Sequence, residues 1–193
     1  MSDKSDSLID NTELKNLYEK YFAKHKPIKA TLAPEMLENI GRIIVAFQRL
    51  ESTIKSAICF LFGNEARDIQ TAYQTHMSFK NLVGMLGYAS ARIDWSGQND
   101  MVRAIKFIRK AEDVRNAIVH SVWVAQGRIK VKNSHADKRP LFKFEEHKPA
   151  ELLNIAESIS QIDTIISALS SLYIQEQLEK GLTIPGVKVI SGE

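Results

Sequence analysis

The chain has 193 residues, 44% of them hydrophobic and 25% charged, with a formal net charge of +3. This size and composition suit a single helical domain over residues 1–193 with a sizeable core. The net charge is too small to indicate nucleic-acid binding by itself. The single cysteine, Cys59, excludes an intrachain disulfide and is expected to be a buried small hydrophobe.

The chain carries no signal for export or membrane insertion. Residues 1–12 are rich in Ser and Asp and lack the apolar segment of a signal peptide. No apolar run approaches the roughly 20 residues that span a bilayer. We therefore expect a cytoplasmic protein with no membrane partner, in which residues 1–11 and 183–193 are flexible tails.

Two helices are predicted in the first third of the chain. The first covers about Glu13 to Lys26 and is expected to pack on the bundle or on a partner. The second runs from Pro34 to Phe62 and has apolar residues at three- and four-residue spacing: Ile40, Ile44, Phe47, Ile54, Ile58 and Leu61. Glu51 stands where this spacing calls for an apolar residue, so its charge needs a partner.

A third helix is predicted to begin after Ser78, whose side chain is suited to cap it. The fourth runs from about Asn99 to His120. Its apolar stripe consists of Met101, Ala104, Ile105, Ile108, Ala111 and Val119. Polar residues enter the core-facing side of this helix near its end: Glu112, Arg115, Asn116 and His120. Glu51 is a candidate partner for Arg115, and the simplest interpretation of such a pair is a structural contact that fixes helix register.

Asn116 and His120 favour a chemical role over a purely structural one. They lie four residues apart on one helix face, so the Asn amide can orient the imidazole. A histidine exchanges protons near neutral pH, and an arginine binds phosphate oxygens with a fork of donors. Together with Arg115 they suit phosphodiester chemistry.

A basic segment follows the polar helix end. Between Gln126 and Lys148, seven basic residues stand against three acidic ones. Arg128, Lys130 and Lys132 alternate with apolar residues, and two phenylalanines flank Lys143, a pattern that predicts a small β-hairpin. Two interpretations stay open: the hairpin guides a phosphate backbone toward the site, or its lysines only discourage strand pairing at a solvated edge.

A last helix is predicted from Ala150 to Lys180, with Gly181 as its stop. Its apolar seam serves either the core or a dimer: Leu152, Ile155, Ile159, Ile162, Ile166, Leu169 and Tyr173. Motifs for other chemistries, such as a glycine-rich phosphate loop or paired cysteines for zinc, do not occur. The remaining histidines lie in separate segments and are interpreted as surface residues: His25, His76, His135 and His147. We expect neither a metal nor a cofactor.

The residues around Arg115 resemble those of the HEPN superfamily (higher eukaryotes and prokaryotes nucleotide-binding). Catalytic HEPN proteins carry an Arg followed, after four to six residues, by a His near a helix end, and here four residues separate Arg115 from His120. The Asn directly after the Arg, and the polar Glu51 within QRLESTIKSAI on an earlier long helix, are also similar to bacterial HEPN ribonucleases. The resemblance spans roughly Pro34 to Tyr173.

This resemblance implies an all-α helical bundle, with the hairpin inserted after the motif helix, that forms a homodimer. Two motifs would then face each other across one composite cleft and cleave RNA without a metal ion. His120 would act as general base or acid, Arg115 would stabilise charge on the phosphoryl oxygens, Asn116 would complete the catalytic set, and Glu51 and Glu112 would support it. The basic residues of the hairpin would bind RNA: Arg128, Lys130, Lys132 and Lys143.

The expected function is that of a toxin or anti-phage defence ribonuclease, with an antitoxin or regulatory protein as a further partner. One subgroup of the family has a Tyr two residues after the His as a modification target. This chain has Val122 there, which leaves regulation by nucleotide transfer without its acceptor. The alternative hypothesis is a non-catalytic HEPN-like module that dimerises or binds a nucleotide or RNA.

Overall fold

The computed structural model describes residues 16, 32–63, 77–124, 127–133 and 140–182. The chain divides into two units, Met1–Thr31 and Leu32–Glu193. In the first unit only Asn16 is described, and it is helical. The rest of the helix predicted from Glu13 to Lys26 lies outside the described residues, as do the predicted tails 1–11 and 183–193.

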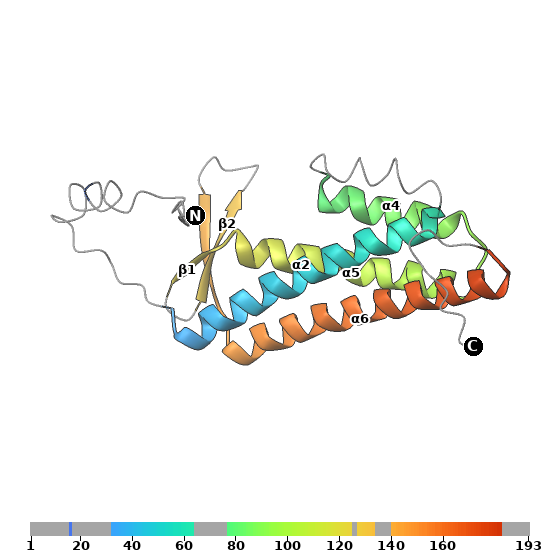
Figure 1. The fold of residues 1–193 in the computed structure, drawn as a ribbon. Helices are drawn as coiled ribbons and strands as arrows, with labels where there is room; N and C mark the ends of the chain where they lie inside the picture. Colours follow the sequence, from blue (N-terminus) through green and yellow to red (C-terminus); the bar gives the residue numbers. More distant parts are fainter. Residues whose placement is uncertain (1–15, 17–31, 64–76, 125–126, 134–139, 183–193) are drawn as a thin grey trace. The chain divides into compact units, whose positions relative to one another are not determined.

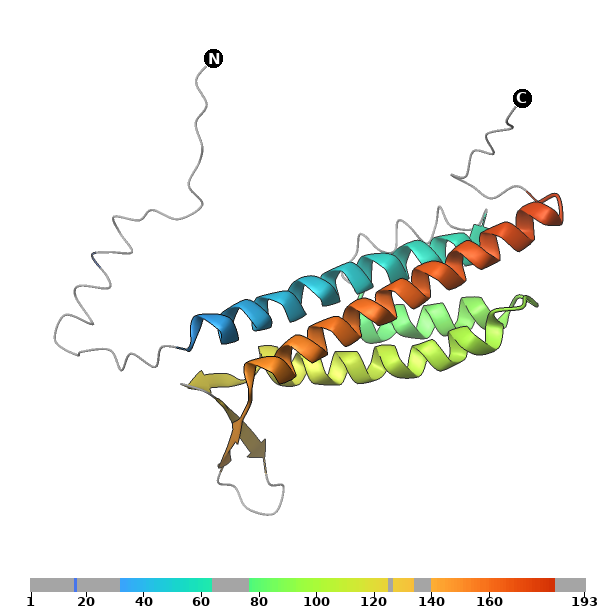
Figure 2. The ribbon, with the colours of Figure 1, turned by 90° about the horizontal axis from the view of Figure 1, so that it is seen from below.

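The second unit is mostly helical in its described part, as an all-α protein is expected to be. Its helices are α2 (Pro34–Phe62), α4 (Phe79–Ala91), α5 (Gln98–Val119) and α6 (Pro149–Glu179). Helix α2 contacts the other three helices. Helix α5 also contacts both α4 and α6 (Figures 1 and 2). No helix in the described ranges is long and apolar enough to cross a membrane.

The helices begin and end at residues suited to those positions. Helix α2 has the predicted bounds, with Pro34 in its first turn. The predicted cap of α4 is confirmed, because Ser78 Oγ accepts a hydrogen bond from the Asn81 backbone N–H at 3.3 Å. Gly181 is confirmed as the stop of α6: its φ of 71° is in the left-handed region, and its N–H donates to the Leu178 carbonyl at 2.9 Å.

The core lies between the helices, along faces close to those predicted. On α2, however, Ile43 is fully buried whereas Ile44 is 36% exposed. On α5, Ile118 is buried and Val119 is 38% exposed, so the expectation for Val119 was wrong. Neighbouring residues on a helix differ by about 100° in direction, and the packing partners decide which of two adjacent apolar residues is covered. The seam of α6 faces the core, where Leu152, Ile159, Ile166 and Tyr173 are buried.

In place of a two-stranded hairpin, the structure has a three-stranded antiparallel sheet. The strands are β1 (Val122–Val124), β2 (Gly127–Asn133) and β3 (Pro140–Glu146), in that spatial order. The segment after His120 is extended and pairs Val122 with Ile129, which adds the third strand. The sheet stands at the end of the helices where α5 ends and α6 begins (Figure 1).

Candidate functional site

The segment from Arg115 to His120 forms the C-terminal end of α5. Arg115 and Asn116 belong to the last helical turns, and His120 is the C-cap residue, with φ −93° and ψ 10°. The His120 backbone N–H still donates to the Asn116 carbonyl at 3.1 Å. The three residues therefore lie within about one and a half turns of each other at an open helix end.

Arg115 is half-buried and held by two contacts. Its guanidinium carbon lies 5.0 Å from the centre of the Phe47 ring on α2, and its Nη1 donates to Asn116 Oδ1 at 2.8 Å. Phe47 is itself only 2% exposed and packs on Phe79, with ring centres 4.5 Å apart. A guanidinium has five N–H donors, so most of those on Arg115 are left without a partner among the described residues and suit an oxyanion.

His120 presents its imidazole to solvent. The side chain is exposed and has no hydrogen-bond partner among the described residues. The expected contact from the Asn116 amide to this imidazole is not formed, because Asn116 Oδ1 accepts from Arg115 instead. The imidazole is thus accessible for proton transfer but is not oriented by Asn116.

Glu51 does not pair with Arg115, which corrects the sequence-based expectation. Its Oε1 accepts from Lys55 Nζ at 2.6 Å, one turn along the same helix, and both side chains are about one-third exposed (39% for Lys55, 34% for Glu51). The i,i+4 pair with Glu on the N-terminal side is the favoured local arrangement. Arg115 instead lies over Phe47, one turn earlier on α2.

A groove between α4 and α5 reaches the motif. Its volume is about 1070 Å³, and Asn116 and Glu112 are among its lining residues. The α4 side contributes Lys80, Asn81 and Tyr88. Sequence analysis did not single out the residues of this groove other than Glu112 and Asn116. The available signal was Tyr88, a large aromatic residue outside the apolar stripe of its helix, which is 60% exposed.

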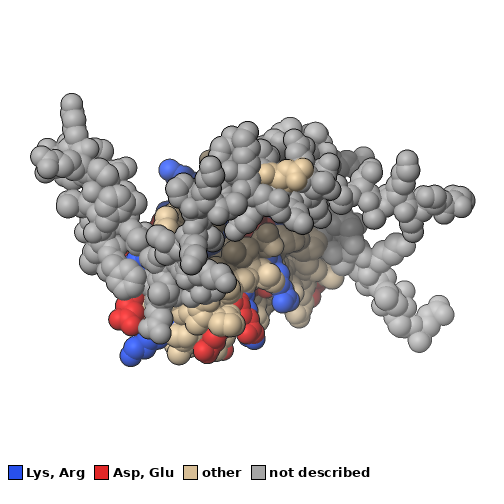
Figure 3. Space-filling model, turned by 90° about the vertical axis from the view of Figure 1, so that its left-hand side faces the viewer, with Lys and Arg blue, Asp and Glu red and all other residues tan. Residues whose placement is uncertain are grey.

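The basic residues of the sheet divide into two kinds. Arg128 is only 11% exposed and forms an ion pair with Glu145, its register partner, with Nε at 3.1 Å and Nη2 at 2.8 Å from Oε2. Arg128 is therefore part of the packing rather than of an exposed basic face. Lys130 lies opposite Lys143 in the register, and Lys132 opposite Leu141. Figure 3 views the molecule from this end, and its coloured surface carries both acidic and basic side chains.

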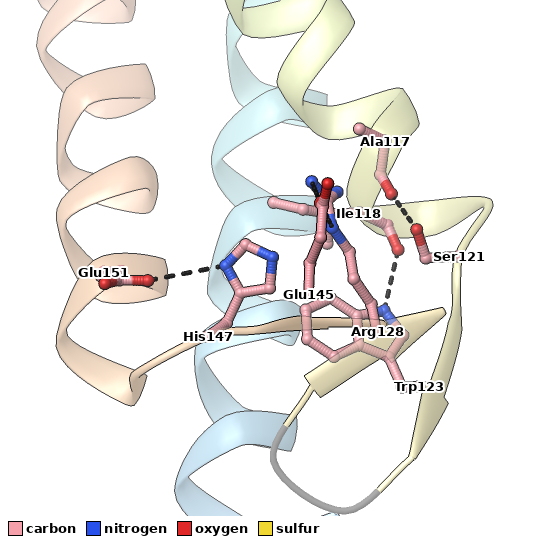
Figure 4. Close-up of polar contacts among 8 residues, drawn as sticks. All are labelled: Ala117, Ile118, Ser121, Trp123, Arg128, Glu145, His147 and Glu151. Atoms are coloured by element: carbon pink, nitrogen blue, oxygen red, sulfur yellow. Dashed lines mark hydrogen bonds and ion pairs between the residues drawn. The ribbon is translucent and has the colours of Figure 1, made fainter. Parts of the chain in front are cut away.

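A cluster around Trp123 attaches the sheet to the motif helix (Figure 4). Trp123 Nε1 donates to the Ile118 carbonyl at 2.9 Å, near the end of α5, and the same carbonyl also accepts from the Ser121 backbone N–H at 3.4 Å. The Ser121 hydroxyl donates to the Ala117 carbonyl in the same way. The Trp123 ring packs against His147, with ring centres 5.7 Å apart. These contacts fix the chain directly after His120.

His147 is not the surface residue that the sequence analysis expected. Its side chain is 18% exposed, and Nδ1 lies 3.6 Å from Glu151 Oε2 in the first turn of α6. Its Nε2 is buried without a hydrogen-bond partner in the described part of the chain. The ring that packs against His147 belongs to Trp123 on β1, which is far from His147 in the sequence. The spacing of residues around His147 therefore could not predict this contact.

Two further features bear on chemistry. Among the described residues, no group of three or more His, Cys, Asp and Glu residues is placed to hold a metal ion. Cys59 is half-buried, and burial raises the pKa of its thiol, which lowers the thiolate fraction and makes it a weak nucleophile.

Comparisons with models of protein families, with curated proteins and with solved structures found no match for this chain.

Proposed function

We propose that this protein is a metal-independent endoribonuclease of the HEPN type. The observation that carries the proposal is the end of α5. There, Arg115 is half-buried and has N–H donors left unused by the described residues, and the exposed His120 follows five residues later. An anchored cation and an accessible proton carrier at the same helix end are two groups that metal-independent phosphodiester cleavage can use. Asn116 holds the guanidinium through its side-chain oxygen.

The proposed reaction is attack of an RNA 2′-hydroxyl on the adjacent phosphorus. The proton of the hydroxyl passes to a histidine acting as general base, the P–O5′ bond breaks, and the leaving oxygen takes a proton from a general acid. The products are a 2′,3′-cyclic phosphate and a 5′-hydroxyl. Arg115 would stabilise the charge on the phosphoryl oxygens. DNA lacks the nucleophile and would not be cut.

A homodimer would complete this site. One motif offers one imidazole, whereas the reaction has two proton transfers, so the second copy would supply the other His120. Apolar surface next to the motif supports such an interface, because Val119 is 38% and Val122 is 60% exposed. Lys130, Lys132 and Lys143 are proposed to contact the RNA backbone, and Arg128 to hold the sheet.

The cellular role we propose is that of a toxin or anti-phage effector in the cytoplasm. Cleavage of cellular RNA by an accessible site would harm the host, so an antitoxin or regulatory protein is a proposed partner. Val122 replaces the tyrosine that one HEPN subgroup uses as a modification target. Control would therefore act by binding rather than by nucleotide transfer to that position.

A second candidate function is a non-catalytic module that dimerises or binds a nucleotide. The stacking of Arg115 on Phe47 favours it, because a guanidinium packed against a buried ring also has a purely structural use. The two functions differ in what His120 does. As a structural residue it would contribute to stability or to dimer formation, whereas as a catalytic residue it is replaceable without unfolding.

The test is cleavage of labelled single-stranded RNA in excess EDTA by the wild type, by His120→Ala and by Lys106→Ala. Lys106 is exposed on α5 and serves as the matched control. We expect the wild type and Lys106→Ala to cut RNA but not DNA, and a folded His120→Ala protein to be inactive. Full activity of His120→Ala would disprove the proposal, as would the absence of cleavage across varied RNAs.

A further inference from the structure

The groove between α4 and α5 is lined by charged side chains that form no ion pair with any described residue. Lys80 on α4 and Arg109, Glu112 and Asp113 on α5 all face it. None of the four has an ion-pair partner among the described residues, although ion pairs form elsewhere on α2 and α5. The volume of about 1070 Å³ lies at the upper end of the range for small-ligand sites.

One wall of the groove is an aromatic platform. Tyr88 is 60% exposed, and its ring centre lies 6.3 Å from that of Phe62. Arg92 is not among the described residues that line the groove, but its guanidinium lies beside this wall, 5.6 Å from the Tyr88 ring centre and 5.8 Å from the Phe62 ring centre. Exposed aromatic rings next to a guanidinium provide a surface on which nucleic-acid bases can stack. Stacking of this kind does not depend on the base sequence.

The charges favour a ligand that carries both an anion and hydrogen-bond donors. The positive charges of Lys80 and Arg109 can bind phosphate groups. The carboxylates of Glu112 and Asp113 can accept hydrogen bonds from N–H groups of a ligand. A nucleotide has both, on its phosphate and on its base edge. We propose that this groove binds the single-stranded RNA next to the scissile phosphate, with one base stacked on Tyr88. The inference rests on the proposed ribonuclease function, since Asn116 of the motif lines the same groove.

The groove runs along α4 from Lys80 to Tyr88 and leads away from the motif. Helices α4 and α5 run antiparallel, and Gly87 packs against Ile105, 3.5 Å from a Cβ placed on the glycine. Lys80 therefore lies toward Asn116, and Tyr88 lies about 12 Å farther along α4 by helical rise. A strand that starts at His120 would pass Lys80 before it reaches the Tyr88 platform.

The groove also predicts a base preference. Glu112 is half-buried, and its carboxylate has no hydrogen-bond or ion-pair partner among the residues that the structure describes, whereas the neighbouring Asp113 is exposed. A carboxylate accepts two parallel N–H bonds, and guanine is the RNA base whose Watson–Crick edge presents two adjacent donors. This chemistry favours guanine over the other RNA bases next to Glu112.

The test measures binding of short fluorescent 2′-O-methyl RNA, which lacks the nucleophile and is not cleaved, by fluorescence polarisation. Tyr88→Ala is expected to raise Kd about tenfold, whereas Tyr88→Phe keeps the stacking and the affinity. Phe107→Ala is the matched control, because Phe107 is 52% exposed with Lys110 Nζ 5.9 Å from its ring centre but does not line the groove. Its Kd is expected to equal that of the wild type.

The guanine preference is tested with two RNAs that are identical except at one position, which is G in one and C in the other. Glu112→Gln is expected to remove the preference and Asp113→Asn to keep it. Equal Kd values for Tyr88→Ala and Phe107→Ala, or no RNA binding by the wild type, would overturn the inference. If the groove variants weaken binding but the wild type does not cleave unmodified RNA, the proposal that the groove binds RNA is supported and the proposed ribonuclease activity is disproved. Cleavage that groove variants leave unchanged would disprove the groove alone.

Discussion

The Arg115 guanidinium on α5 lies 5.0 Å from the centre of the Phe47 ring on α2. This contact joins the proposed catalytic residue to a ring that is only 2% exposed and that packs on Phe79. The position of the cation is thus set by the helix packing and not by a carboxylate. Any change that moves α2 relative to α5 would move the guanidinium with respect to His120.

The first prediction concerns this contact and uses a double-mutant cycle of Phe47→Leu with Arg115→Gln. Because a cation on an aromatic face at a partly desolvated site contributes about 1 kcal/mol, we expect a coupling energy of that size. The measurement is urea unfolding of the four proteins. The same cycle with Phe79→Leu, which lies behind Phe47, should give a much smaller coupling. Additive effects of Phe47→Leu and Arg115→Gln would show that the stacking contributes nothing.

The second prediction concerns Glu176, which links α6 to the turn before α5. Its carboxylate accepts from the Ser96 hydroxyl and from the Ser96 backbone N–H at 3.2 and 3.3 Å. The hydrogen bond from the Ser96 side chain holds the pKa of Glu176 below its ordinary value of 4.5. A depressed pKa in the folded state adds stability above the unfolded-state value, and this stability is lost as the pH falls.

We therefore expect the Tm advantage of the wild type over Glu176→Gln to be present at neutral pH and to shrink below pH 4.5. The measurement is thermal unfolding of both proteins across this range, with Glu179→Gln, an exposed residue one turn away, as the control. A difference that does not change with pH would show that the charge of Glu176 is not linked to folding.

The third prediction compares two glycines with opposite conformations. Gly181 has a φ of 71°, so Gly181→Ala places a Cβ in the left-handed region and should destabilise the protein by about 1 kcal/mol. Gly41 lies inside α2, and nothing is within 4 Å of a Cβ placed there. Because Ala loses less chain entropy in a helix, Gly41→Ala should stabilise by about 0.5–1 kcal/mol. Shifts of the same sign in denaturant midpoint would contradict the assigned geometry.

The sequence was a good guide to local structure and a poor guide to side-chain partners. The Ser78 cap and the bounds of α2 follow from interactions within a few residues, and both were predicted. The partners of Glu51 and Arg115 were not predicted. A periodic pattern shows which face of a helix is buried, but it does not show how far that helix is shifted along its axis relative to a neighbouring helix. Glu51 pairs with Lys55, which lies one turn away in the same helix, and not with Arg115.

By itself the sequence determined the four described helices, most of their ends, and the gathering of Arg115, Asn116 and His120 at one helix end, since hydrogen bonds and periodicity within a segment fix these. Only the tertiary structure decided that Arg115 stacks on Phe47, that Arg128 is held by Glu145 and that Asn116 opens into a groove with Tyr88. Each of these contacts joins residues from different elements. Their distances depend on how whole helices and strands pack, which no local pattern specifies.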